Sequence, residues 1–154
     1  MPTIRTTRTV RHTPERMFDL VADVARYPEF VPLCEKLLVR SRSQTGEGDT
    51  VIVATMTVAY KVFRESFTSR VVLKRASRQI DVTYLDGPFK LLENRWNFEP
   101  AANGGCKVEF YLHYEFRSRT LALVMGAVFD KVFGRYATAF EGRADALYGR
   151  PAPA

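Results

Sequence analysis

The first part of the chain predicts a strand followed by a short helix. Thr3–Arg11 is rich in Thr, Val and Ile, residues that favour strands. Thr13 followed by Pro14 indicates a helix start, because a threonine side chain caps the first free amides and proline fits the first turn. Apolar residues then recur at helical spacing over Met17–Ala22, and Pro28 interrupts that pattern. We therefore expect one or two short helices after the first strand.

From residue 35 to residue 117 the apolar and polar positions alternate with a period of two, which is typical of half-buried strands. Short links rich in Gly, Asn and Pro separate the strands, and such links suit hairpins rather than helical crossovers. The sequence predicts an antiparallel meander with strands at Lys36–Ser43, Thr50–Tyr60, Lys61–Leu73, Arg78–Leu85, Lys90–Phe98 and Lys107–Arg117.

The apolar pattern returns to helical spacing after Arg119 and predicts one long helix that ends near Tyr148. Such a helix would be roughly 40 Å long at about 1.5 Å per residue. Its stretch Leu121–Phe129 has no polar side chain, and a helix that is apolar nearly all round is deeply buried or contacts something besides its own sheet. Four-residue spacing predicts that the side facing the sheet consists of Val124, Val128, Val132 and Tyr136.

This order of elements predicts an α+β fold in which a curved antiparallel sheet of six to seven strands wraps around the C-terminal helix. A strongly twisted sheet curls away from a straight helix, so we expect a pocket with apolar walls between them. We expect a single domain over residues 1–148 and a disordered tail at 149–154.

Composition and charge exclude several classes of protein. The chain has 154 residues and only two cysteines and two histidines, too few for the common zinc and haem motifs. The first residues contain no apolar block of the kind found in a signal peptide, and no later segment approaches the length of a membrane span, so we expect a cytoplasmic protein. The formal net charge is +6, and Arg5, Arg8 and Arg11 supply half of it. No basic run of the kind that follows DNA phosphates is present, and no DNA partner is expected.

Three segments resemble a known family. Tyr27–Cys34, with the sequence YPEFVPLC, is similar to a segment of the coenzyme Q-binding START-like proteins, which belong to the polyketide cyclase and lipid-transport superfamily. Residues 65–71 (ESFTSRV) and 86–98 (DGPFKLLENRWNF) resemble later signatures of the same proteins. The departure is Leu33, where many relatives have Trp, which keeps the position apolar but removes an aromatic ring.

The resemblance implies a helix-grip fold and a defined function. It implies binding of ubiquinone, an isoprenoid quinone, in support of respiratory electron transport, without turnover of the quinone and without a required cofactor. It also implies a protein, expected to be monomeric, that contacts the inner membrane from the cytoplasmic side. Bacterial members are also described as ribosome-association toxins, so a ribosome-associating regulator that uses the basic surface is one alternative. A polyketide-cyclase-like enzyme is the other.

Two groups of residues are the candidate ligand site. Phe30 and Val31 lie between Pro28 and Pro32, and Leu33 directly follows. An apolar loop of this kind is typical of a gate or a membrane contact; the alternative is that the loop folds over the sheet. The hydroxyl of Tyr114 is a candidate partner for a quinone carbonyl. The predicted cavity wall consists of Met56, Val58, Phe67, Leu92, Trp96, Phe110, Leu112, Tyr114, Val128, Val132 and Tyr136.

Candidate catalytic groups are few. A nucleophilic pair of Cys34 and His113 is disfavoured, because His113 shares the polar face of its strand with glutamates. A cyclase would need a carboxyl group inside the cavity, where its pKa would rise. By strand parity Glu93 points outward, whereas Glu65 shares a face with Phe67 and could either face the cavity or pair with an arginine on the surface.

Overall fold

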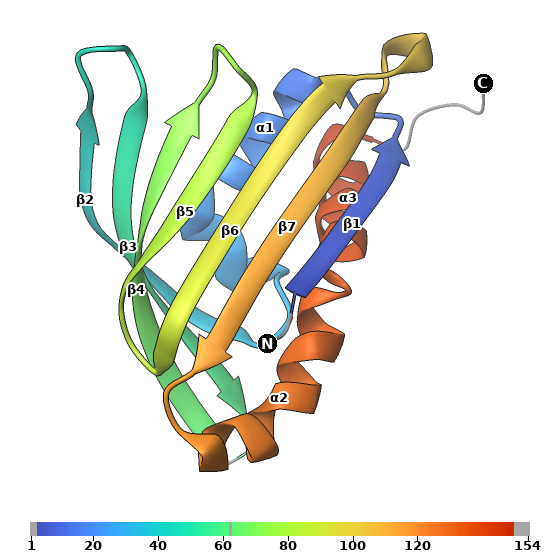
Figure 1. Ribbon diagram of the computed structural model, residues 1–154. Coiled ribbons are helices and arrows are strands. Elements are labelled where there is room, and N and C mark those ends of the chain that lie inside the picture. Colours follow the sequence, from blue (N-terminus) through green and yellow to red (C-terminus); the bar gives the residue numbers. More distant parts are fainter. Residues whose placement is uncertain (1–2, 62, 150–154) are drawn as a thin grey trace.

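The computed structural model describes residues 3–61 and 63–149 and contains one antiparallel sheet of seven strands (Figure 1). The spatial order is β1-β7-β6-β5-β4-β3-β2, so consecutive strands are neighbours from β2 to β7, and β1 joins the meander beside β7. The strands are β1 (Thr3–Val10), β2 (Cys34–Gln44), β3 (Thr50–Tyr60), β4 (Phe63–Lys74), β5 (Gln79–Asp86), β6 (Phe89–Pro100) and β7 (Cys106–Phe116).

The helices gather on one side and at one end of this sheet. In Figure 1, α1 and α3 lie behind the sheet and α2 lies at its lower end. None of the helices in the described part of the chain is long and apolar enough to cross a bilayer. The helical elements are α1 (Pro14–Ala22), α2 (Arg119–Phe133), α3 (Tyr136–Tyr148) and the short 3-10 helices η1 (Val24–Glu29) and η2 (Ala102–Gly104).

The predicted fold class is confirmed. All the predicted strands form, each within about two residues of its expected ends. Thr13 caps α1, because its hydroxyl accepts a hydrogen bond from the Arg16 amide at 3.2 Å. Register shifts at four points, two of them between β2 and β3, mark bulges or irregular pairing, and bulges bend and twist a sheet. Both short helices after the first strand are present as α1 and η1.

The expectation of one unbroken C-terminal helix was wrong, because the chain leaves helical geometry at Gly134 and Arg135. Glycine costs about 1 kcal/mol relative to alanine inside a helix, and Arg135, the N-cap of α3, has φ −101° and ψ 0°, away from the mean α-helical values. The side of α2 that faces the sheet also differs from the prediction: Met125 and Phe129 are buried, whereas Val124 is 42% exposed. In α2 the side that faces the sheet therefore contains Met125 and Phe129, each one residue after the predicted Val124 and Val128.

Parts of the predictions fall outside the described residues. These are the side chain of Val132 and residues 150–154 of the predicted tail. Gly149 is described and directly follows α3.

Strand alternation separates an apolar inner face from a polar outer face. On β7 every second residue from Cys106 to Phe116 is buried and the residues between are partly exposed. The inner residues form rows across the sheet, such as Ile80, Trp96 and Phe110, which are register partners on β5, β6 and β7. The core therefore lies between the inner face and the helices.

The turn between β5 and β6 gives a test of this packing. Gly87 has φ +143°, and a Cβ atom there would lie 2.6 Å from the Phe67 Cβ. We expect Gly87→Ala to lower the free energy of unfolding by about 2 kcal/mol or more, as measured by urea denaturation. Gly46→Ala is the control, because no atom lies within 4 Å of a Cβ at that position. A similar small loss for both variants would contradict the close approach of Gly87 to β4.

Candidate functional site

An apolar cavity of about 90 Å³ lies between the inner face of the sheet and the segments η1 and α3. Strands β2 to β7 each contribute side chains to its wall, and α3 closes it with Tyr136 and Phe140. Seven residues predicted from the sequence line it, namely Met56, Phe67, Leu92, Trp96, Phe110, Leu112 and Tyr136. Sequence parity therefore located much of the strand-borne wall.

Several lining residues were not predicted. Strand alternation alone would have predicted Leu37, Ala54, Ser69 and Asn94, because the neighbours of each residue along its strand face outward. Tyr27 and Phe140 lie in helical elements. The spacing of apolar residues along the sequence did not predict how these elements are rotated relative to the sheet.

Six of the predicted wall residues do not line this cavity. Among them are residues of the Phe30 loop, which was expected to be exposed but is packed against the protein. Phe30 packs edge-to-face on Phe140 with ring centroids 5.1 Å apart, and Val31 is only 5% exposed. The loop therefore folds over the sheet, which was the alternative interpretation of its apolar residues. The predicted wall residues that do not line the cavity are Phe30, Val31, Leu33, Val58, Tyr114 and Val128.

Tyr114 is fully buried outside the cavity, beneath α2. Its hydroxyl donates a hydrogen bond to Asp130 Oδ1 at 3.0 Å, and its ring contacts Phe89 and Phe116. Burial and the neighbouring carboxylate of Asp130 raise the pKa of Tyr114. In this conformation the hydroxyl anchors α2 to β7 instead of facing the cavity.

Aromatic contacts hold α3 over the cavity. Phe140 is 1% exposed and its ring centroid lies 5.0 Å from that of Trp96 and 5.4 Å from that of Tyr27. Tyr27 is fixed in turn, because its hydroxyl donates a short hydrogen bond to the carbonyl oxygen of Val21 at the end of α1. The ring of Phe140 therefore connects α3 to both η1 and the sheet.

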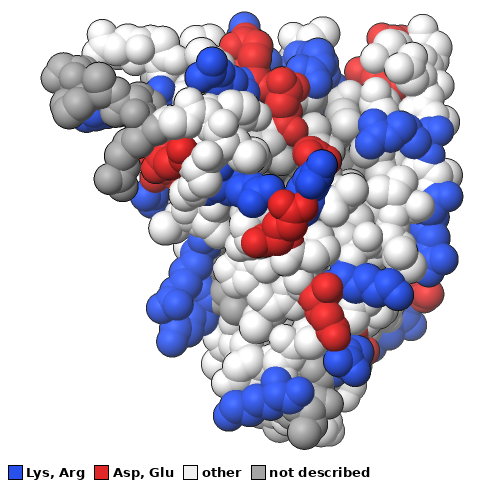
Figure 2. Space-filling view, turned by 180° about the vertical axis from the view of Figure 1, so that it is seen from behind, with Lys and Arg blue, Asp and Glu red and all other residues white. Residues whose placement is uncertain are grey.

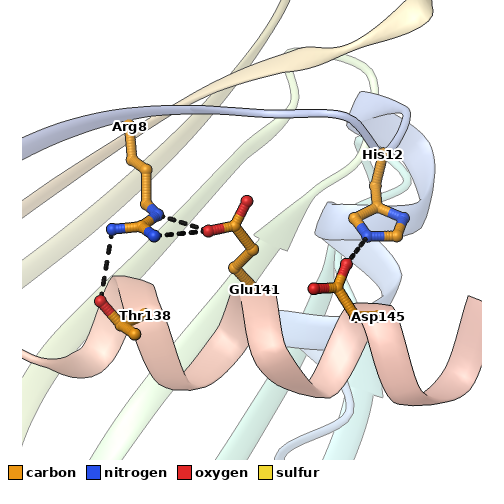
Figure 3. Close-up of polar contacts among 5 residues, drawn as sticks. All are labelled: Arg8, His12, Thr138, Glu141 and Asp145. Atoms are coloured by element: carbon orange, nitrogen blue, oxygen red, sulfur yellow. Dashed lines mark hydrogen bonds and ion pairs between the residues drawn. The ribbon is translucent and has the colours of Figure 1, made fainter. Parts of the chain in front are cut away.

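Polar contacts along β1 fix the position of α3 (Figure 3). The Arg8 guanidinium donates to Glu141 Oε1 at 2.7 Å and to Thr138 Oγ1 at 3.3 Å. His12, which is 3% exposed, contacts Asp145 Oδ1 through Nε2 at 2.7 Å. In Figure 2, which shows the molecule from behind, acidic and basic side chains lie next to one another across this side.

Two polar side chains interrupt the apolar wall. Asn94 donates through Nδ2 to the backbone oxygen of Tyr111 at 2.9 Å. Ser69 is 6% exposed, and its hydroxyl has no hydrogen-bond partner among the described residues. A buried hydroxyl without a partner costs free energy, so Ser69 is a candidate donor to a bound molecule.

The lining has no ionised side chain. Among the described residues that form the wall, there is no Asp, Glu, Lys, Arg or His. Burial raises the pKa of both Tyr27 and Tyr136, so their hydroxyls stay protonated. This cavity can enclose an apolar molecule and donate hydrogen bonds, but its wall supplies no general base at neutral pH.

The disfavoured cysteine–histidine pair is not formed. Burial raises the pKa of the Cys34 thiol to about 11, and its Sγ contacts the backbone oxygen of Lys36. His113 is on the outer face of β7, where Nδ1 lies 2.8 Å from Thr3 Oγ1. A protonated thiol is a weak nucleophile.

A family model described as polyketide cyclase / dehydrase and lipid transport matches residues 10–141. The chain belongs to this family. The "Ribosome association toxin RatA" of Vibrio cholerae is 36% identical over 140 residues, which cover 91% of this chain and 93% of that protein. The "Coenzyme Q-binding protein COQ10 homolog B, mitochondrial" of Xenopus laevis is 31% identical over 140 residues, covering 88% of this chain and 55% of that protein.

The fold is also that of a solved aromatase/cyclase. The crystal structure of the Zhui aromatase/cyclase from Streptomyces sp. R1128 has a TM-score of 0.78 with this chain at 18% identity, and the match covers 97% of this chain and 99% of that one. At this identity the likeness concerns the fold alone. The relatives of this chain thus carry names that refer to different functions.

The two glutamates considered for acid–base chemistry do not line the cavity of this family member. Glu93 is exposed and points outward, as predicted from parity. Glu65 lies on the inner-face parity of β4, opposite Val58, and is partly buried. The arginines proposed as its surface partners contact other groups: Arg64 pairs with Glu35 at 2.7 Å, and the Arg95 guanidinium lies over the Tyr111 ring.

The Ser69 hydroxyl gives a test that needs no ligand. We expect Ser69→Ala to leave the free energy of unfolding of the ligand-free protein unchanged or to raise it by up to about 1 kcal/mol, because an unpaired buried hydroxyl is removed. Urea denaturation measures the change. The control Ser66→Ala removes an exposed hydroxyl that is 2.8 Å from Thr57 Oγ1 and should cost a few tenths of a kcal/mol. A clear loss of stability in Ser69→Ala would show that this hydroxyl has a partner.

Proposed function

We propose that this protein binds an isoprenoid quinone such as ubiquinone in the cavity and carries it, without chemical turnover, in support of respiratory electron transport. The observation that supports this most directly is an apolar wall interrupted by one buried hydroxyl, that of Ser69, which has no hydrogen-bond partner among the described residues. An isoprenoid tail fits apolar walls, and a ring carbonyl accepts a hydrogen bond from a hydroxyl. The proposed place of action is the cytoplasmic surface of the inner membrane.

The volume of the cavity determines what has to move before a quinone can enter. About 90 Å³ is less than the roughly 150 Å³ of an engineered cavity that holds benzene. A quinone therefore requires that the wall expands. The strands are held by backbone ladders, whereas α3 is held by ring contacts and a few ion pairs. Movement of α3 and η1 away from the sheet is the route that breaks the fewest hydrogen bonds.

A binding role is supported over a catalytic one by the chemistry of the wall. A cyclase needs groups that move protons. The polar groups in the described wall are protonated tyrosines, one serine and one asparagine amide. The name of the Xenopus relative, a coenzyme Q-binding protein, agrees with a quinone as ligand.

A variant that fills the cavity tests the proposal. Ala54 lines the wall and is 6% exposed, so Ala54→Leu places a larger side chain in the space where the ligand would lie. We expect quinone recovered by solvent extraction of the purified protein to fall by about tenfold or more, because overpacking opposes insertion. The measurement is liquid chromatography with mass spectrometry of the extract, normalised to protein.

The matched control is Ala146→Leu, the same change at an exposed position of α3. It should retain the quinone of the unmodified protein. Val82→Leu adds volume at another lining position and should reproduce the loss if Ala54→Leu unfolds the protein. Equal quinone in all four proteins, or none in the unmodified protein after expression in a quinone-containing host, would overturn the proposal.

Association with the ribosome is a second candidate function, supported by relatives named RatA and by a basic part of the outer face. Lys36, Arg40 and Arg70 are exposed on β2 and β4. Arg40 donates to Thr55 Oγ1 at 3.1 Å, and Thr55 is hydrogen-bonded to Thr68. Cations surrounded by hydroxyl groups suit phosphate oxygens.

The two candidate functions use opposite faces, so they can be tested separately. We expect the double variant Arg40→Glu and Arg70→Glu to lose cosedimentation with ribosomes, and binding of the unmodified protein to fall steeply with salt because counterions are released. The control, Lys90→Glu with Lys107→Glu, makes the same charge change on β6 and β7. Salt-independent binding, or equal loss in both double variants, would contradict a phosphate-binding surface on β2 and β4.

A further inference from the structure

The first turns of α2 present an apolar surface that the rest of the described chain leaves uncovered. Leu123 is 86% exposed and Val124 is 42% exposed, and the neighbouring Ala122 and Ala127 are also exposed. Monomeric proteins scatter single exposed apolar residues, whereas a contiguous group of them indicates an interaction surface. We call Ala122, Leu123, Val124 and Ala127 the α2 patch.

The opposite side of the same helix is already used. Met125 is 2% exposed and Phe129 is 3% exposed, and the Phe129 ring lies 5.3 Å from that of Phe116 and 6.2 Å from that of Phe89. The Tyr114 hydroxyl bonded to Asp130 adds a polar anchor. Because these contacts fix the rotation of α2, the α2 patch is held facing away from the sheet.

Cations surround the α2 patch. Arg117, Arg119, Lys131 and Arg135 are all exposed, and Asp130 is the only acidic residue from position 117 to position 135. The Arg117 side chain is fixed by a hydrogen bond from Nε to the Phe89 carbonyl oxygen at 2.9 Å. In Figure 2 the narrow lower end of the molecule, where Figure 1 places α2, is mostly white with blue side chains at its borders.

We propose that the α2 patch docks onto an anionic phospholipid surface, with its apolar side chains among the acyl chains and the surrounding cations at the headgroups. Apolar side chains on one face with arginine and lysine beside them are the arrangement by which a helix lies in a membrane interface. The sequence placed the membrane contact at the Phe30 loop, but Phe30 packs on Phe140 of α3. The structure assigns the contact to α2 instead.

The charges favour a lipid surface over a second copy of this chain. In a symmetric dimer through the α2 patch, the arginines and lysine of each copy would face those of the other, and like charges brought together oppose association. An anionic bilayer provides the opposite sign to all four cations at once.

The experiment is flotation of the full chain with vesicles that contain no quinone, so its outcome is independent of the proposed carrier function. We expect binding to vesicles of equal parts phosphatidylglycerol and phosphatidylcholine. Leu123→Gln should weaken it by about tenfold, because one leucine no longer enters the apolar layer. Glutamine leaves the net charge unchanged, and the matched control Leu147→Gln changes a leucine of α3 that is 53% exposed and should bind as the unmodified protein does.

The charge contribution is tested with Arg119→Gln and Lys131→Gln together. We expect a loss of roughly thirtyfold on the mixed vesicles and little change on pure phosphatidylcholine. Arg40→Gln with Arg70→Gln removes the same charge from β2 and β4 and should bind like the unmodified protein. Equal binding by the Leu123 variant and the unmodified protein would overturn the proposal. So would a dimer, seen by light scattering, that Leu123→Gln dissociates in the absence of vesicle binding.

Discussion

The contact between α3 and the inner face of the sheet is the interaction on which the cavity depends. Phe140 touches Trp96 on β6 and also Tyr27 and Phe30 of the segment around η1, so one ring joins three parts of the molecule. Ring contacts of this kind are stabilised largely by burial of area and depend less on direction than hydrogen bonds do. Such a closure can be separated and re-formed more readily than a strand can leave its sheet.

The polar contacts of α3 have a different role from the ring contacts. Arg8 and His12 of the β1 segment meet Glu141 and Asp145 one helical turn apart, which sets both the rotation and the axial position of α3 (Figure 3). On the other side Arg143 pairs with Glu29, the last residue of η1, and the Arg143 and Arg26 guanidiniums hold the pKa of that carboxyl below its usual range. Exposed ion pairs of this kind add little stability, but they specify the position that α3 takes when it packs on the sheet.

Sequence patterns predicted the fold and about half of the strand residues in the cavity wall, because a strand has only two faces. Once Trp96 and Phe110 are assigned to the apolar face, alternation assigns their neighbours as well. The helical parts were harder to predict. An apolar stretch such as Leu121–Phe129 has no polar face to set its rotation, so Val124 and Met125 could not be told apart by spacing. The break at Gly134 had a local signal, because glycine is unfavourable inside a helix, but the apolar pattern continues beyond it to Tyr136 and Phe140.

The Phe30 segment shows a second limit of the same kind. An apolar loop between two prolines has the same composition whether it faces water or lies under a helix. Its burial here is decided by Phe140, a residue more than a hundred positions away. The uncovered surface lies on α2 instead, which has more apolar side chains than the sheet covers. Tertiary packing decides which of them are exposed.

The small volume of the closed cavity follows from the cost of empty apolar space. At about 24 cal/mol per Å³, a void of about 90 Å³ costs about 2 kcal/mol. A void of roughly 400 Å³, enough for a ring and part of an isoprenoid tail, would cost about 10 kcal/mol, which is comparable to the whole stability of a typical domain. A carrier with this fold therefore has to contract when it is empty. The sheet resists contraction because its strands are tied by backbone hydrogen bonds, so the change in volume falls to α3 and η1, the elements held by rings and side-chain pairs.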